Sequence, residues 1–409
     1  MADNRTFVIA GASLAGAKAA ETLRAEGFEG QIVLVGQEPV RPYERPPLSK
    51  GYLRGEVGFD AAAVHEERFY SDQSIELRTS TTIASIDPTS KVVIFQNDEK
   101  LLYDQLLLTT GAVPRVLSIP GSELPGINYL RSIASCDALK LALGQADRVV
   151  VVGAGWIGCE VAASARQLGK DVAMIDAARV PLERVLGSDV GEIFKELHED
   201  HGVTLHLGVG VEGFRGTDSV EEVVLSDGTA VPGDLFVVGV GVTPRTELAE
   251  AAGLEIDNGV LVDEYLATSV PGIWAAGDIA NAFHPTFGMR IRLEHWSAAL
   301  GQGPAAARNM LGQKTPYTKI PYFFSDQYDL GMEYSGYATD WDTLVIRGDR
   351  EKREFVAFWL TEGRVRAGMN VNTWGVTDQI ASLVQSKRVV DTRRLEDPDV
   401  DISELANQD

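Results

Sequence analysis

The chain has 409 residues, which exceeds the usual size of a single hydrophobic core, so we expect two or three domains. Its 44% hydrophobic content and 41 glycines are typical of a folded α/β protein with many tight turns and exclude a disordered or fibrous chain. The net charge of −22 opposes binding to nucleic acid or to anionic lipid, because both present dense negative charge.

The N-terminal region predicts a nucleotide-binding unit. Residues 6–38 comprise a β-branched strand, a glycine turn, an alanine-rich helix and a second strand, which is the order of a βαβ unit. Residues 75–104 contain short alternating runs between turn signals and predict a small antiparallel insertion. A return strand is expected at Gln105 to Thr110.

The same order then repeats. Residues 148–178 predict a second βαβ unit, and residues 203–244 predict a second meander followed by a buried strand and a glycine turn. Residues 273–280 predict another strand and turn, followed by a helix from Trp296 to Leu311. From about Tyr317 the sequence is aromatic and strand-like, which predicts a third, α+β domain. The acidic tail after Arg394 is expected to be a solvated surface segment.

The second glycine turn, Gly153-Ala154-Gly155-Trp156-Ile157-Gly158, is a complete G-x-G-x-x-G between a predicted strand and helix. Such a turn lets a pyrophosphate reach the free N–H groups of a helix N-terminus. Asp176 ends the next strand and is predicted to accept from a ribose 2′-hydroxyl, which favours NADH over NADPH. Arg179 lies nearby and is the residue type that an NADPH site prefers.

The first turn, Gly11-Ala12-Ser13-Leu14-Ala15-Gly16, carries Ser13 where the second glycine belongs. The serine adds a side chain at the closest phosphate approach, although its hydroxyl can donate to a phosphate oxygen. Glu38 is the candidate ribose acceptor here and Gln37 is the alternative. Asp278, after a predicted strand, is placed for a ribityl hydroxyl or the pyrophosphate turn, with a helix N-cap as the alternative interpretation.

Three further features limit the function. No segment approaches the roughly 18 apolar residues that a membrane helix needs. The N-terminus lacks the basic start and cleavage site of an export signal, so a cytoplasmic protein is expected. Cys136 and Cys159 are isolated in the sequence and predict neither a disulfide framework, a metal cluster nor a redox dithiol; both are expected to be small buried residues.

The ordered motifs GASLAG, RPPLSK, TTGAVPR, YLRS, GAGWIGCE, VGVGVTP, GIWAAGDIA and FSDQYD together resemble a known family. Over essentially the whole chain, they are similar to the FAD-dependent NADH:ferredoxin reductases of bacterial oxygenase systems. That class includes putidaredoxin, rhodocoxin and biphenyl-dioxygenase reductases. RPPLSK and FSDQYD are more specific than the glycine turns. The resemblance is weaker to rubredoxin reductases and apoptosis-inducing factor.

The resemblance implies an α/β, glutathione-reductase-like fold with two Rossmann-like nucleotide-binding domains and an α+β C-terminal domain. The expected boundaries are 1–108 with 241–318 for a discontinuous FAD domain, 109–240 for the NAD domain and 319–409 for the C-terminal domain. It also implies hydride transfer from NADH to FAD, followed by release of single electrons to a two-iron two-sulfur ferredoxin that supplies a cytochrome P450 or Rieske-type oxygenase.

The resemblance further implies roles for individual residues. Lys50 matches a lysine beside the flavin N5 edge and Glu160 matches the glutamate that pairs with it, which makes these two the expected catalytic residues. The expected FAD contacts are Gly11, Ser13, Leu14, Ala15, Gly16, Gln37, Glu38, Arg45, Lys50, Ile83, Thr110, Gly111, Arg131, Asp278 and Trp296. The expected NAD contacts are Gly153, Gly155, Ile157, Gly158, Asp176 and Gly241, and no metal site is expected.

Two other functions remain open from the sequence. One is a flavin NADH oxidase, peroxidase or quinone reductase, and the other is a redox-gated binding protein similar to apoptosis-inducing factor. A monomer or a homodimer is expected. An acidic ferredoxin would need a local basic patch on this acidic chain. The candidate patches are Arg290 with Arg292, Arg308 with Lys314, and Arg388 with Arg393 and Arg394.

Overall fold

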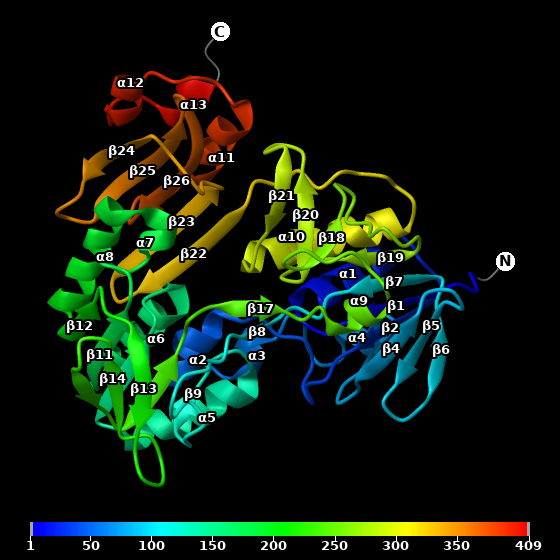
Figure 1. The fold of residues 1–409 in the computed structure, drawn as a ribbon. Coiled ribbons are helices and arrows are strands. Elements are labelled where there is room, and N and C mark those ends of the chain that lie inside the picture. Colours follow the sequence, from blue (N-terminus) through cyan, green and yellow to red (C-terminus); the bar gives the residue numbers. More distant parts are fainter. Residues whose placement is uncertain (1–2, 407–409) are drawn as a thin grey trace. The chain divides into compact units, whose positions relative to one another are not determined.

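The computed structural model describes residues 3–406 and divides into two compact units (Figure 1). The first unit contains the chain up to Glu44, Phe59–Val113 and Thr243–Pro321, and the second contains Arg45–Gly58, Pro114–Val242 and the chain from Tyr322 onward. The finer division into FAD, NAD and C-terminal domains stays a prediction. Among the described residues, no helix is both long and apolar enough to cross a membrane.

The first unit is built on a parallel sheet with the strand order β19-β7-β1-β2-β3. Its strands are β1 (Thr6–Ala10), β2 (Gln31–Val35), β3 (Ile75–Arg78), β7 (Gln105–Leu108) and β19 (Ile273–Ala275). β1 pairs in parallel with both β2 and β7, as expected for a βαβ unit followed by a return strand. The prediction that residues 75–78 belong to an antiparallel insertion is wrong, because β3 pairs in parallel with β2.

Two smaller sheets complete the first unit. One consists of β4 (Ile83–Asp87), β5 (Val92–Phe95) and β6 (Lys100–Leu102), and the other of β18 (Val260–Val262), β20 (Ala280–His284) and β21 (Met289–Arg292). The short helices are α3 (Phe59–Ala62), α4 (Phe69–Asp72) and α9 (Glu247–Ala251). β8 (Ala112–Pro114) pairs with β17 (Val242–Pro244) where the chain passes between the units.

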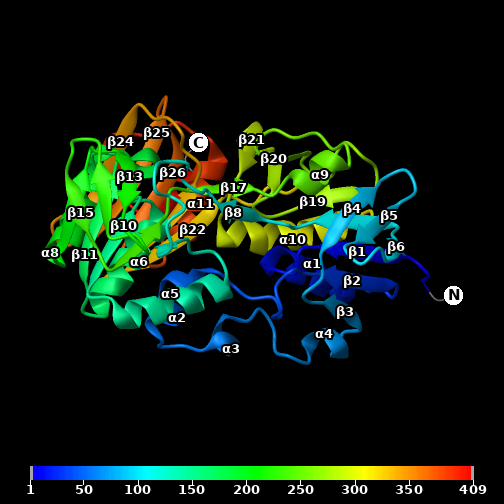
Figure 2. The same cartoon turned by 60° about the horizontal axis from the view of Figure 1, so that its bottom comes forward.

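The alanine-rich helix α1 (Leu14–Ala25) packs along α10 (Trp296–Met310), as both views show (Figures 1 and 2). The approach is so close that a Cβ on Gly303 would lie 2.2 Å from the Ala15 carbonyl oxygen. Small side chains in both helices therefore allow this contact. The packing fixes the N-terminus of α1 directly after the first glycine turn.

A second parallel sheet, ordered β12-β11-β10-β16-β9, forms the core of the second unit. Its strands are β9 (Ile127–Asn128), β10 (Arg148–Val152), β11 (Asp171–Asp176), β12 (Val203–Leu207) and β16 (Leu235–Val238). The meander is β13 (Val211–Arg215), β14 (Glu222–Leu225) and β15 (Ala230–Pro232). The helices are α2 (Gly51–Arg54), α5 (Ile133–Gln145), α6 (Trp156–Gln167), α7 (Glu183–Leu186) and α8 (Ser188–Asp200). This repeats the predicted βαβ layout.

The C-terminal part of the second unit is an antiparallel sheet with α11 (Thr377–Ser386), α12 (Thr392–Glu396) and α13 (Ile402–Ala406), drawn in orange and red in Figure 1. Its strand order is β22-β23-β26-β25-β24. The strands are β22 (Tyr322–Gln327), β23 (Leu330–Gly336), β24 (Thr343–Asp349), β25 (Glu354–Thr361) and β26 (Arg364–Val371). Trp359 is fully buried, and its indole N–H donates to the Leu186 carbonyl at 3.1 Å.

The acidic tail was predicted to be a solvated segment, and its described charged residues are indeed mostly exposed, but the prediction missed three buried apolar residues. Leu395 on α12 and Ile402 and Leu405 on α13 are buried, although the residues between them are mostly charged and exposed. The many charged residues made the amphipathic pattern hard to recognise in the sequence. A few apolar side chains anchor the segment to the core.

Truncating one of these anchors is expected to destabilise the protein. Ile402→Ala should lower the free energy of unfolding by about 2–4 kcal/mol, because it removes buried methyl groups and leaves a cavity. The exposed neighbour Asp399→Ala is the matched control and should change it by less than about 0.5 kcal/mol. Urea denaturation measures both. Equal, small effects would mean that the tail does not contribute to the core.

Candidate functional site

The first glycine turn is shaped by close backbone contacts in the first unit. Gly11 has a φ of +128°, and a Cβ there would lie 2.1 Å from the Thr109 carbonyl oxygen. A Cβ on Gly16 would lie 2.1 Å from the Gly11 carbonyl oxygen, so both positions require glycine. Ser13 is the N-cap of α1, with extended backbone and no side-chain capping bond. The turn therefore leads directly into the N-terminus of α1, and helix N-termini in this position commonly bind a pyrophosphate.

Gln37 and Glu38, the two candidate ribose acceptors, each have a partner in the first unit. The Gln37 Oε1 accepts from Arg245 Nη1 at 2.8 Å, and the Glu38 Oε2 accepts from the Tyr43 hydroxyl at 2.6 Å. Glu38 is half-buried and Gln37 is exposed. Amide and carboxylate oxygens can each accept more than one hydrogen bond, so Gln37 and Glu38 can both still accept from a ribose hydroxyl. The choice between them stays a prediction.

The other predicted FAD residues of the first unit lie at the ends of its elements. Leu14 and Ala15 begin α1, Ile83 begins β4, Thr110 and Gly111 follow β7, and Trp296 begins α10. Asp278 follows β19, and β20 comes next instead of a helix. The alternative interpretation of Asp278 as a helix N-cap is therefore wrong.

The three glycines of the second turn differ in their surroundings: two are packed tightly against backbone and one faces open space. A Cβ on Gly153 would lie 2.4 Å from the Gly239 carbonyl oxygen, and one on Gly158 would lie 1.8 Å from the Gly153 carbonyl oxygen. Gly155, the N-cap of α6, has nothing within 4 Å of its Cβ position. The turn thus leaves open space at the helix N-terminus, at the position where a pyrophosphate would approach. This geometry fits a dinucleotide.

Asp176 lies at the end of β11, and its carboxylate supports the glycine turn. Its Oδ2 accepts from the Ala154 N–H at 2.6 Å and its Oδ1 from the Ala178 N–H at 2.8 Å. Remaining lone pairs stay available to a ribose hydroxyl. Ile157 is 44% exposed in the first turn of α6, and Gly241 has a φ of +104° with open space at its Cβ position. Arg131 precedes α5, and its N–H donates to Ser135 Oγ at 3.0 Å.

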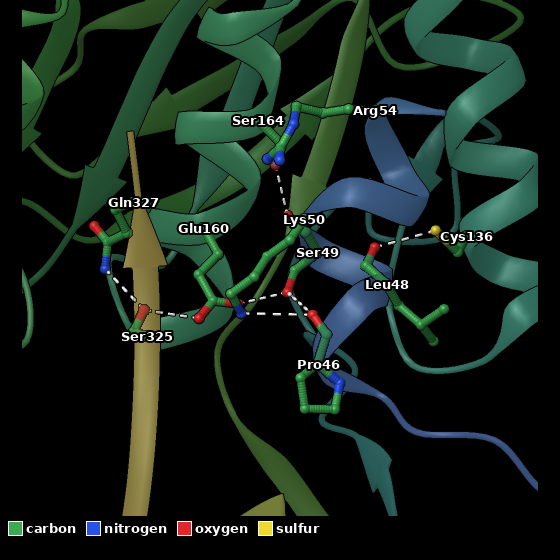
Figure 3. A network of polar contacts seen from close by, with 10 residues as sticks. All are labelled: Pro46, Leu48, Ser49, Lys50, Arg54, Cys136, Glu160, Ser164, Ser325 and Gln327. Carbon is green, nitrogen blue, oxygen red and sulfur yellow. Dashed lines mark hydrogen bonds and ion pairs between the residues drawn. The ribbon is translucent and has the colours of Figure 1, made fainter. Parts of the chain in front are cut away.

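The RPPLSK segment forms a short 3-10 helix, Pro46–Ser49, directly before α2 in the second unit. Arg45 is its N-cap, and the prolines at the first positions fix φ. Side chains hold the backbone that follows (Figure 3): the Cys136 thiol donates to the Leu48 carbonyl at 3.1 Å, and the Ser164 hydroxyl donates to the Ser49 carbonyl at 2.6 Å. The position of Lys50 is thereby fixed relative to α6.

Lys50 and Glu160 form a buried ion pair in this segment (Figure 3). The Lys50 Nζ lies 2.7 Å from the Glu160 Oε2, and the side chains are only 14% and 5% exposed. Burial of an ion costs several kcal/mol unless it is paired and its lone pairs are satisfied. The ammonium also lies 5.6 Å from the centre of the Phe324 ring, a favourable cation–π contact. The Lys50 ammonium is therefore stabilised both by the Glu160 carboxylate and by the Phe324 ring.

Two hydroxyls complete the environment of the Glu160 carboxylate. The Ser49 Oγ lies 2.5 Å from the Glu160 Oε2, and the Ser325 Oγ on β22 lies 2.7 Å from the Glu160 Oε1. Both carboxylate oxygens are thus hydrogen-bonded. Nearby, partial desolvation of the Asp326 carboxylate, whose residue is otherwise exposed, raises its pKa, and the Lys50 charge opposes that rise. The site combines a held cation with a carboxylate that cannot rotate freely.

Three polar residues of this site were not predicted from the sequence: Ser49, Ser325 and Gln327. Ser49 lies within RPPLSK and the other two lie within FSDQYD, motifs that by themselves indicate no role for these positions. The sequence shows no alternation here, because Ser325, Asp326 and Gln327 are all polar, and the burial of the first and third is seen only in the structure. Buried polar residues on one strand face require partners, but only the fold identifies those partners.

Two family models match this chain. Residues 5–303 match the model described as pyridine nucleotide-disulphide oxidoreductase, and residues 322–406 match the model described as reductase C-terminal. The chain is 38% identical over 403 residues to the 5,5′-dehydrodivanillate O-demethylase ferredoxin reductase subunit of Sphingobium sp., covering 97% of each chain.

Solved structures agree over the full length. The ferredoxin reductase for the CYP199A2 system from Rhodopseudomonas palustris superposes with a TM-score of 0.95 at 35% identity, covering 98% of this chain and 100% of that one. Putidaredoxin reductase, in its covalent complex with putidaredoxin, gives a TM-score of 0.94 at 35% identity, covering 98% of each chain. The likeness thus includes the C-terminal sheet as well as both parallel sheets.

A pair of alanine substitutions tests the two roles of the second glycine turn. Gly155→Ala should keep the melting temperature but raise the KM for NADH about tenfold or more, since its Cβ enters only the open space. Gly158→Ala should cost about 3 kcal/mol or more of stability, because its Cβ collides with the Gly153 carbonyl. Thermal melts and steady-state kinetics measure these effects. An unchanged KM for NADH in Gly155→Ala would contradict the hypothesis that the pyrophosphate binds at the open space beside Gly155.

Proposed function

Because this chain belongs to the pyridine nucleotide-disulphide oxidoreductase family, we propose that it is a FAD-dependent NADH:ferredoxin reductase. The observation that carries this proposal is the arrangement on helix α6. Its N-terminus presents the open glycine cradle at Gly155, and its next turn carries Glu160, which holds Lys50. One rigid helix thus connects a dinucleotide cradle to a buried cation.

The overall reaction balances with two equivalents of ferredoxin. One NADH and two oxidised ferredoxins give NAD⁺, one proton and two reduced ferredoxins. FAD, when bound, supplies the step between the two-electron donor and the one-electron acceptor. The chain's own residues bind the nucleotides, hold them in position and set the local charge.

We assign the residue roles as follows. The second glycine turn binds the NADH pyrophosphate, and Asp176 binds the adenosine ribose. The first glycine turn, with Asp278, Trp296 and the other expected contacts, binds FAD. Lys50 supplies positive charge that favours hydride arrival at the flavin, and Glu160 keeps the ammonium charged and in place. The fixed 3-10 helix and the hydroxyls around Glu160 support these two roles.

The cysteines favour a one-electron acceptor over a disulfide substrate. Cys136 and Cys159 are both buried, on different helices, and each thiol donates to a backbone carbonyl. Burial raises the pKa of Cys136 to about 12 and raises that of Cys159 as well, which disfavours reactive thiolates. We therefore propose that electrons pass to an iron–sulfur protein of the two-iron two-sulfur type.

The basic patches considered as docking sites are largely engaged inside the chain. Arg290 donates to the carbonyls of Val262 and Asn281, and Arg292 pairs with Glu294. Arg308 pairs with Glu26, and Arg394 pairs with Glu404. Each of the three patches thus has one arginine paired with a nearby acid, so shape and local contacts are expected to contribute more to docking than long-range attraction.

Turnover with a panel of ferredoxins tests the proposed function. The purified holoprotein should reduce cytochrome c rapidly with NADH only when a suitable ferredoxin is present, and should consume oxygen slowly. Rapid oxygen or quinone reduction without any ferredoxin would support the oxidase or quinone reductase alternative. An NADH-dependent change of oligomeric state with negligible turnover would support the redox-gated binding protein.

Removing the ammonium should slow flavin reduction. Lys50→Ala is expected to retain FAD but to lower the rate of flavin reduction by NADH about tenfold to a hundredfold, because one fixed charge is lost. Lys352→Ala removes a lysine that is 72% exposed and is the control. Stopped-flow absorbance measures both rates. If Lys50→Ala reduces its flavin at the wild-type rate, Lys50 has no role in the reaction.

Removing the charge at Asp176 should weaken the preference for NADH. Asp176→Asn is expected to lower the ratio of kcat/KM for NADH to that for NADPH about tenfold, because the carboxylate repels the 2′-phosphate. Any loosening of the glycine turn would lower both values, so the ratio isolates the charge. An unchanged ratio would show that the ribose is recognised elsewhere.

A further inference from the structure

Behind Glu160, buried polar side chains continue the network through β22 and into α8. The Ser325 Oγ lies 3.2 Å from the Gln327 Nε2, and the Gln327 Oε1 lies 3.1 Å from the His198 Nε2. The His198 Nδ1 lies 3.0 Å from the Tyr328 hydroxyl. Ser325, Gln327 and His198 are each 0% exposed, so water does not satisfy these groups. Figure 3 shows the beginning of this chain, from Glu160 to Gln327.

The charge on Glu160 determines the direction of every hydrogen bond in the chain. An ionised carboxylate only accepts, so the single hydroxyl hydrogen of Ser325 points to Glu160. The Ser325 oxygen must then accept from the Gln327 amide nitrogen, which turns the Gln327 oxygen toward His198. That oxygen requires a donor, so the His198 Nε2 carries the ring hydrogen.

The remaining nitrogen of His198 makes the last hydrogen bond in this series. With its hydrogen on Nε2, neutral His198 presents a bare Nδ1 that accepts from the Tyr328 hydroxyl. Burial lowers the pKa of His198 to about 4, although the hydrogen bond to Gln327 partly opposes this and His201 adds a smaller lowering, so the ring stays neutral at physiological pH. The Tyr328 ring is stacked on His201 with centroids 3.7 Å apart, which holds the hydroxyl in place.

We propose that Ser325, Gln327 and His198 are positioning residues for the redox site. They form a one-directional series of hydrogen-bond donors that ends at the Glu160 carboxylate and holds it in position against Lys50. Aligned hydrogen bonds polarise one another in a low-dielectric interior, so the chain strengthens its last bond to the carboxylate. The functional consequence rests on the proposed function, whereas the direction of the chain rests on the Lys50–Glu160 pair alone.

Several charged or titratable groups lie near this hydrogen-bonded series. Asp326 interacts electrostatically with Lys50, Glu160, Arg54 and Glu333, and Cys159 with Glu160 and Asp176. His198 interacts with His201, and Tyr328 with Cys159 and Arg166. Asp326 is the neighbour whose protonation competes most directly, because burial raises its pKa. The readout must therefore report on His198 itself as well as on turnover.

The histidine tautomer tests the proposal without turnover. In holoprotein labelled with ¹⁵N-histidine, His198, assigned through its loss in His198→Asn, should show the neutral Nε2–H tautomer from pH 5 to pH 8. Ser325→Ala should release the constraint and raise the Nδ1–H population to at least about a tenth. The control Ser335→Ala, a buried serine on the adjacent strand, should leave the tautomer unchanged. A wild-type Nδ1–H tautomer, or a charged ring at pH 7, would overturn the proposed direction.

The pH profile tests the link to the reaction. In Ser325→Ala, the pH at which NADH-dependent flavin reduction falls to half on the acid side should rise by about one to two units, the equivalent of one lost charge-assisted hydrogen bond. Ser325→Thr retains the hydroxyl and should restore the wild-type profile. An unmoved profile with the expected tautomer would reject the positioning role but keep the chain's direction. Failure of ferredoxin reduction in the wild type would instead reject the proposed function.

Discussion

The buried carboxylate of Glu160 is the constraint on which the rest of this site depends. A charge at that depth is tolerated only when it is paired and every lone pair has a donor. Lys50 supplies the pair, and the hydroxyls of Ser49 and Ser325 supply the donors. Because these groups come from a 3-10 helix, helix α6 and strand β22, one charge fixes the relative positions of separate parts of the second unit.

The two glycine turns share one backbone layout but differ in their middle residue. In both, a glycine with positive φ and a glycine at the first helical turn are enforced by backbone contacts. The middle position differs: Gly155 leaves open space, whereas Ser13 adds a hydroxyl. Selection of packing glycines is therefore common to the fold, and the middle position is free to adapt to its own nucleotide.

The local features of this fold could be predicted from the sequence, whereas contacts between distant segments could not. The strand–glycine–helix pattern placed β1, α1, β10 and α6, because each depends on neighbouring residues. The sheet partner of β3, the buried side of the acidic tail and the neighbours of Asp278 depend on tertiary packing. Lys50 and Glu160 were found through motif resemblance, but Ser325 donates across 165 positions of sequence, and no local pattern marks that partner.

The C-terminal sheet is part of the site because of strand β22. Phe324 contacts the Lys50 ammonium, while Ser325 and Gln327 on the opposite face of the strand reach Glu160 and His198. The two faces of one short strand thus contact both members of the ion pair. The sheet both covers Glu160 and supplies the Ser325 hydroxyl that replaces water at its Oε1. The residues that match the two family models therefore meet at Glu160: the carboxylate lies in the first matched range and its Ser325 donor in the second.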